Sequence, residues 1–204
     1  MVSQLSEAVL DVIADALVDK GYLCLSEVFP AELTDALRRC LLEEELRPAA
    51  IGRGAEQQLN RDIRRDKIRW LESHYEPDCR YLDLMEQLKQ GLNRRLFLGL
   101  FDYESHYALY EPGAFYRKHV DALKGSQNRI LTTVYFMNPD WQPGQGGELL
   151  IYDETQQLLE TVAPTHGKLV IFLSERFPHE VLPTEVRRAS IAGWFRVAGS
   201  RHGF

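Results

Sequence analysis

Three residues of this chain have the types and spacing of a metal site: His119, Asp121 and, much later, His179. His119 and Asp121 lie two residues apart in a stretch with strand character. Both side chains are therefore expected on one face, with Cα atoms about 6.6 Å apart at roughly 3.3 Å per residue. Two imidazoles and one carboxylate form the facial triad that holds non-haem Fe(II) and leaves coordination positions open. The sequence thus predicts an iron site made by these three residues.

An arginine and a serine follow the second histidine. Arg188 comes nine residues after His179, and its guanidinium fork matches the geometry of a carboxylate. Ser190 lies on the same predicted strand face and can add a hydroxyl group. A three-residue iron site leaves room for a bidentate 2-oxo acid and O₂. We therefore expect Arg188 and Ser190 to hold the remote carboxylate of such a co-substrate.

The selectivity of this pattern comes from its order, because each residue alone has a more ordinary explanation. An isolated arginine is usually a solvated strand charge, and an isolated histidine is usually structural or exposed. His74, His106, His166 and His202 are interpreted in that way, although His106 is also a candidate pocket residue. The complete pattern is much more selective than its parts, and it remains a motif hypothesis that depends on structural context.

The elements that must position these residues fall into two halves. Apolar residues recur at helical spacing from Leu5 to Lys20, a second helix is predicted after Pro30, and a third from Asp78 to about Leu98. Residues 22–28 and 66–71 have strand character, whereas residues 47–60 have no clear period and are predicted to form a loop.

After Phe101, short apolar runs alternate with turn residues. The predicted strands are 106–110, 115–120, 130–137, 148–152, 158–162, 168–173, 180–182 and 189–197. Short strands at near-regular spacing are typical of a jelly roll, and helices that precede them can pack outside the barrel. We predict an α+β fold with a double-stranded β-helix (jelly-roll) core. One domain should cover 1–204, with helical support to about residue 100 and the barrel at about 101–198.

Composition limits the class of protein. A net charge of −6 and a pI of about 5.6 disfavour binding to a phosphate backbone. Three scattered cysteines suggest reduced thiols, the N-terminus has no secretory signal pattern, and no apolar run approaches the roughly 20 residues of a membrane span. We therefore predict a cytoplasmic protein with no nucleic-acid or membrane partner.

Several motifs, taken together, resemble the Fe(II)/2-oxoglutarate-dependent prolyl hydroxylases, specifically the branch of the hypoxia-inducible-factor prolyl hydroxylases and their bacterial counterparts. The resemblance runs from about Asn60 to Arg196. Besides the triad and Arg188, it rests on Asp62–Trp70, Tyr110–Gly113, Tyr116–His119, Tyr135–Asn138, Asp140-Trp141, Gly146–Leu149 and Trp194.

This resemblance implies roles for further residues. Tyr110 would lie beside 2-oxoglutarate, and the pocket walls would be Val134, Leu149, Val181 and Trp194. On the substrate side it implies Arg64, Tyr116 and an Asp66–Arg129 charge pair. The cofactors would be Fe(II) and 2-oxoglutarate, with ascorbate as supporting reductant. One position departs from the animal pattern, because Phe136 replaces a tyrosine that reaches the co-substrate; Ser190 or Thr133 is the candidate replacement donor.

The implied reaction is hydroxylation of a prolyl residue in a protein substrate, giving succinate and CO₂. Elongation factor Tu is one candidate, because bacterial members of the branch act on it. The arginine-rich segment 53–69 would close over the substrate near an acidic region. Two alternatives remain open: a hydroxylase of a free amino acid or other small molecule on the same barrel, and a non-catalytic iron or oxygen sensor.

Overall fold

The computed structural model describes residues 4–43, 46–49, 62–122 and 128–198. Three helices are present in these ranges: α1 (Glu7–Asp19), α2 (Ala31–Glu43) and α3 (Glu76–Leu96). The first strands are β1 (Tyr22–Ser26), β2 (Arg47–Pro48), β3 (Lys67–Trp70), β4 (Leu100–Tyr110), β5 (Tyr116–His119) and β6 (Arg129–Phe136). The remaining strands are β7 (Leu149–Tyr152), β8 (Leu158–Val162), β9 (Lys168–Leu173), β10 (His179–Val181) and β11 (Arg188–Val197).

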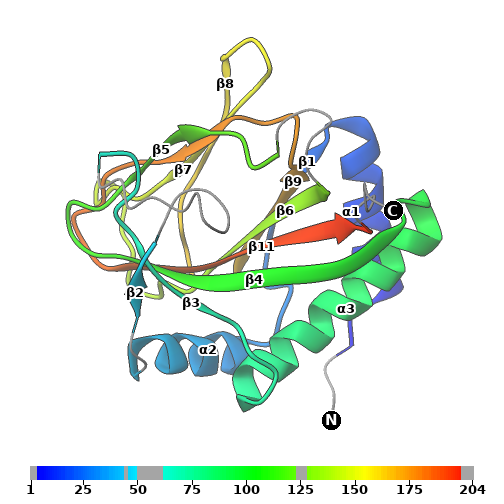
Figure 1. Ribbon diagram of the computed structural model, residues 1–204, viewed down its shortest axis with the longest axis horizontal. Helices are drawn as coiled ribbons and strands as arrows, with labels where there is room; N and C mark the ends of the chain where they lie inside the picture. The colour runs from blue at the N-terminus through cyan, green and yellow to red at the C-terminus, as the bar shows by residue number, and fades with distance from the viewer. Residues whose placement is uncertain (1–3, 44–45, 50–61, 123–127, 199–204) are drawn as a thin grey trace, which may run out of the picture.

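The strands form two antiparallel sheets. The larger has the order β1-β9-β6-β11-β4-β3-β2, and the smaller has the order β5-β10-β7-β8. Figure 1 shows the smaller sheet above the larger one and helices α2 and α3 below it. The predicted double-sheet barrel with helices packed outside is therefore confirmed.

Strand alternation divides the side chains of the larger sheet between two layers. On β11, Ala189, Ile191 and Phe195 belong to the core shared with the helices. Arg188 and Ser190 point the other way, into the space between the sheets. A register slip of one residue would exchange these two sets, so the apolar odd-numbered residues fix which polar residues reach the site.

The helices begin and end where local chemistry predicts. The side chain of Ser6 accepts a hydrogen bond from the backbone N–H of Val9, which caps α1. Pro77 occupies the first turn of α3, and Phe97 ends that helix in the left-handed conformation. None of the described helices is long and apolar enough to cross a membrane.

The structure differs from the sequence predictions at three strands. Strand β4 begins at Leu100 rather than His106, because it pairs with β11 as far as Val197 despite its alternating charged residues. Strand β5 ends at His119, so Asp121 lies just beyond it. The short strand β2 lies in the predicted loop 47–60, of which residues 50–60 are outside the described ranges.

Candidate active site

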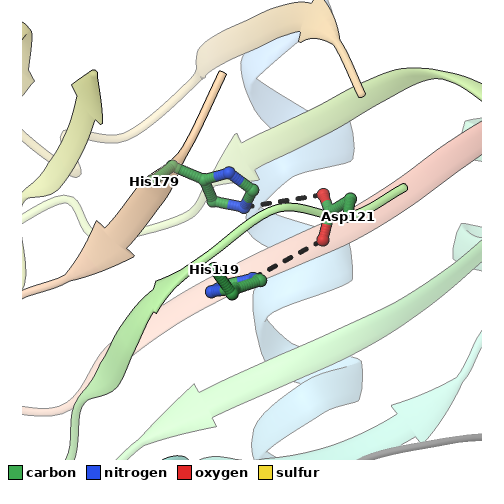
Figure 2. Close-up of side chains that lie close together, drawn as sticks. All are labelled: His119, Asp121 and His179. Carbon is green, nitrogen blue, oxygen red and sulfur yellow. Dashed lines mark ion pairs between the residues drawn. The ribbon is translucent and has the colours of Figure 1, made fainter. Parts of the chain in front are cut away.

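His119, Asp121 and His179 converge between the two sheets, as Figure 2 shows. Strands β5 and β10 are hydrogen-bonded neighbours, and His119 and His179 are register partners across them. The Nε2 atoms of the two histidines lie 3.5 Å from the two carboxylate oxygens of Asp121, His119 from Oδ1 and His179 from Oδ2. The potential ligand atoms all lie within 4.8 Å of one another, so this group can hold a metal ion.

Backbone hydrogen bonds select the tautomer of both histidines. Nδ1 of His119 donates to the carbonyl of Arg117 at 2.8 Å, and Nδ1 of His179 donates to the carbonyl of Phe177 at 3.0 Å. Since Nδ1 carries the proton, each Nε2 keeps a lone pair that faces the centre of the group. Burial lowers the pKa of His179 to about 4, which keeps its ring neutral and available as a ligand.

Asp121 supplies the negative charge of the group. Burial by itself would raise its pKa, but the adjacent His179 and His119 hold the pKa well below its ordinary value. Its Oδ2 accepts a hydrogen bond of 2.8 Å from the hydroxyl of Thr132 on β6. Because that hydroxyl hydrogen is committed to Asp121, the 2.9 Å contact between Thr132 and Ser174 requires Ser174 to be the donor. Two hydroxyl groups therefore orient the carboxylate.

The triad lies in a cavity of about 910 Å³ between the sheets. Most of the residues singled out in the sequence line it, namely His119, Asp121, His179, Arg188, Ser190, Tyr110, Val134, Leu149, Val181, Trp194, Arg64, Arg129 and Tyr116. Asp66 does not line the cavity, because its carboxylate is buried against Arg64.

Arg188 is the most unusual cavity residue because it is 1% exposed and has no ion-pair partner among the described residues. Its Nε donates to the carbonyl of Gly147 at 3.1 Å and its Nη1 donates to Ser190 Oγ at 2.8 Å, whereas its Nη2 is buried without a hydrogen-bond partner. Burial lowers its pKa, yet arginine keeps its proton in proteins. An unpaired buried cation is costly, so this position calls for a bound anion.

Aromatic rings enclose the guanidinium of Arg188. Its Cζ lies 4.7 Å from the ring centre of Tyr110 and 4.8 Å from that of Phe136. Phe136, the departure noted in the sequence, therefore packs against the arginine. Of the two candidate replacement donors, Ser190 reaches Arg188, whereas Thr133 faces the helical side and contacts the Tyr103 hydroxyl and the Gly193 carbonyl.

The predicted Asp66–Arg129 pair is wrong. Asp66 accepts hydrogen bonds of 2.6 and 2.8 Å from Arg64, and Arg129 instead pairs with Glu104 at 2.8 Å. Strands β4 and β11 separate β3 from β6, a span of roughly 14 Å at about 4.8 Å per strand. Arg64 is two residues from Asp66 on the same extended segment, so it satisfies the carboxylate locally.

The substrate-side arginines that the structure describes are already engaged. Arg64 lies over the ring of Tyr116 as well as pairing with Asp66. Arg69 pairs with the buried carboxylate of Asp78, and Arg53 and Arg61 lie outside the described residues. The proposed contact of this segment with an acidic peptide stays a prediction.

Among the cavity residues that sequence reasoning missed are Thr132 and Glu104. Thr132 lies two positions before Val134 and therefore on its cavity face, a relation that strand alternation alone could have revealed. Glu104 was missed because the predicted strand began at His106, whereas β4 begins at Leu100 and so includes Glu104.

The residues of the cavity fit the metal ion and the co-substrate that the sequence predicted, Fe(II) and 2-oxoglutarate. Two imidazoles and one carboxylate suit Fe(II), and the unpartnered N–H of Arg188 suits the remote carboxylate of a 2-oxo acid.

Comparison with protein families shows a match to the 2OG-Fe(II) oxygenase superfamily over residues 105–196. Egl nine homolog 1 from Rattus norvegicus is 33% identical over 151 residues, which cover 70% of this chain and 44% of the rat protein. The human protein of the same name is also 33% identical over 151 residues, which are 35% of its length. The chain thus spans less than half the length of these relatives.

Two solved structures have similar folds. A Pseudomonas putida prolyl-4-hydroxylase aligns with a TM-score of 0.83 and 41% identity, covering 92% of this chain and 98% of that chain. A prolyl hydroxylase from Trichoplax adhaerens aligns with a TM-score of 0.82 at 22% identity, covering 93% of this chain and 90% of that chain, and supports the fold alone.

Proposed function

We propose that this chain, which belongs to the 2OG-Fe(II) oxygenase superfamily, hydroxylates a prolyl residue of a protein substrate. The family uses Fe(II) and 2-oxoglutarate. The observation that carries the proposal is the buried, unpaired Arg188 in the same cavity as the triad, since that pair of features suits a metal with an anionic co-substrate. The 41% identity to a prolyl-4-hydroxylase supports prolyl C4 as the position modified.

In this proposal, His119, Asp121 and His179 hold the iron. When bound, Fe(II) with O₂ and 2-oxoglutarate supplies the oxidising power that places one oxygen atom in a C–H bond and the other in succinate, with loss of CO₂. Thr132 keeps one oxygen of Asp121 hydrogen-bonded, which favours a carboxylate of fixed orientation.

Arg188 orients the co-substrate. Its Nη2 donates to the remote carboxylate, while Ser190 and the carbonyl of Gly147 fix the plane of the guanidinium. Tyr110 and Phe136 pack against the guanidinium and shield it from water, which strengthens the charge interaction in a medium of low dielectric constant. Val134, Leu149 and Val181 supply the apolar walls beside it.

The cavity is large enough for a substrate side chain in addition to the co-substrate. Its volume of about 910 Å³ is near the upper end of small-molecule pockets, which span roughly 300–1,000 Å³. Trp70, 46% exposed, and Arg47 lie among its lining residues, on β3 and β2. Such room supports a peptide segment over a free amino acid.

The test is mass spectrometry of host lysate incubated with the protein, Fe(II), 2-oxoglutarate and ascorbate. We expect a proline that gains the mass of one oxygen atom, and no such product with His119→Ala. A parallel assay offers free proline. Hydroxylation of free proline without any modified protein would contradict the proposal, and so would an absence of both products in the presence of bound iron and 2-oxoglutarate.

A further inference from the structure

His106 is a buried polar residue of the cavity that the proposed chemistry does not use. It lies on β4, is 2% exposed and lines the cavity together with Ala108 and Tyr110 of the same strand face. Its register partners are Trp70 on β3 and Ala192 on β11. The residue therefore lies in the wall of the larger sheet, between the exposed Trp70 and the interior.

Local contacts fix the protonation of this ring. Nδ1 lies 3.1 Å from the carbonyl of Tyr107 and must donate to it, so Nε2 carries the lone pair. Burial and the nearby Arg64 lower the pKa of His106 to about 4, although Asp66 opposes them. At neutral pH His106 is therefore a hydrogen-bond acceptor.

Among the residues that the structure describes, that acceptor has no hydrogen-bond donor. The ring of His106 contacts the rings of Trp70 and Trp194, at centroid distances of 5.2 and 5.5 Å. The charged groups that line this part of the cavity are engaged elsewhere, Arg64 with Asp66 and Arg129 with Glu104. No group among the described residues donates to Nε2 of His106, and this atom is not one of the fully buried polar atoms that lack a partner. Nε2 is therefore accessible from the cavity and can accept a hydrogen bond from a bound molecule.

We propose that Nε2 of His106 accepts a hydrogen bond from the substrate, and that the donor is a backbone N–H beside the target proline. This inference rests on the proposed function. A prolyl residue within a chain has no N–H of its own, so the donor must belong to a flanking residue. His106 thereby positions the main chain and selects peptides that present a free amide next to the proline.

The experiment uses capped peptides with one central proline, chosen from a library by turnover with the wild-type enzyme. In each chosen peptide, single flanking amides are replaced by esters, which removes one N–H at a time. We expect one ester to lower kcat/KM of the wild type by up to about tenfold, as expected for the loss of one hydrogen bond between enzyme and substrate. The variant His106→Phe keeps a ring between the two tryptophans, and its kcat/KM on the all-amide peptide should be lower than that of the wild type by a similar factor. In this variant, the same ester should change kcat/KM by less than twofold.

Three controls separate this role from a structural one. His106→Gln keeps an acceptor and should restore part of the activity. His166→Phe changes a histidine that pairs with Asp35 and does not line the cavity, so its kcat/KM should be unchanged. The affinities of His106→Phe for Mn(II) and 2-oxoglutarate should equal those of the wild type, and its ratio of succinate to hydroxyproline should rise because the peptide is less well placed.

Two results would overturn the inference while leaving the proposed function intact: equal kcat/KM in wild type and His106→Phe, or ester effects that are the same in both. A wild-type enzyme that binds 2-oxoglutarate and hydroxylates no peptide would overturn both.

Discussion

Replacing Arg188 by lysine tests the co-substrate site most directly. Lysine keeps the positive charge but has no planar fork, so it cannot bond to Ser190, to the carbonyl of Gly147 and to a bound carboxylate at the same time. The loss of one charge-assisted hydrogen bond costs about 1.5–3 kcal/mol. We therefore expect the Kd for 2-oxoglutarate to rise roughly 10- to 150-fold.

The assay is calorimetric titration of 2-oxoglutarate into the Mn(II)-loaded protein. Mn(II) affinity, measured first, should change less than twofold, because Arg188 makes no contact with the triad in the described hydrogen bonds. Arg187→Lys is the matched control: Arg187 is the adjacent arginine, its side chain is 66% exposed, and it pairs with Glu111. Its 2-oxoglutarate affinity should equal that of the wild type.

The assignment of Arg188 would be refuted if Arg188→Lys bound 2-oxoglutarate as tightly as the wild type. It would also be refuted if Arg188→Lys and Arg187→Lys weakened 2-oxoglutarate binding by the same factor, since the exposed arginine would then matter as much as the buried one. A variant that lost only Mn(II) affinity would show that Arg188 supports the metal instead.

Two further predictions concern residues beside the triad. Thr132→Val removes the hydroxyl that orients Asp121 and should weaken Mn(II) binding by roughly 10- to 100-fold in a calorimetric titration. Thr132→Ser keeps the hydroxyl and should preserve the Mn(II) affinity. Equal Mn(II) affinities in the wild type and both variants would exclude the orienting role. Because the pKa of His106 is about 4 in the fold and about 6.5 when unfolded, its contribution to stability is complete above pH 6.5 and declines as the pH falls toward 4. Between pH 7.5 and 5, urea unfolding of the metal-free wild type should therefore lose about 2 kcal/mol more than unfolding of His106→Phe, and equal losses would contradict a neutral His106.

The sequence alone predicted the parts of this protein that depend on local order. Short apolar runs bounded by turn residues identified strands such as β6 and β9, and helical spacing identified α1 and α2, because each pattern arises within one element. The alternation of side chains along a strand placed Arg188 and Ser190 on one face, and the structure confirms it. The residue types of the predicted triad were also evident without any structure, since metal preference follows from ligand chemistry.

Only the tertiary structure decided which residues from different strands meet. It paired Arg129 with Glu104 in place of Asp66, joined Thr132 to Asp121, and left His106 with an acceptor that no described group satisfies. These contacts depend on strand order and on the length of β4, which are set by pairing between segments far apart in the chain. Alternation determines the face on which a side chain lies, but the neighbouring strand determines what it contacts, and that neighbour is not encoded in local spacing.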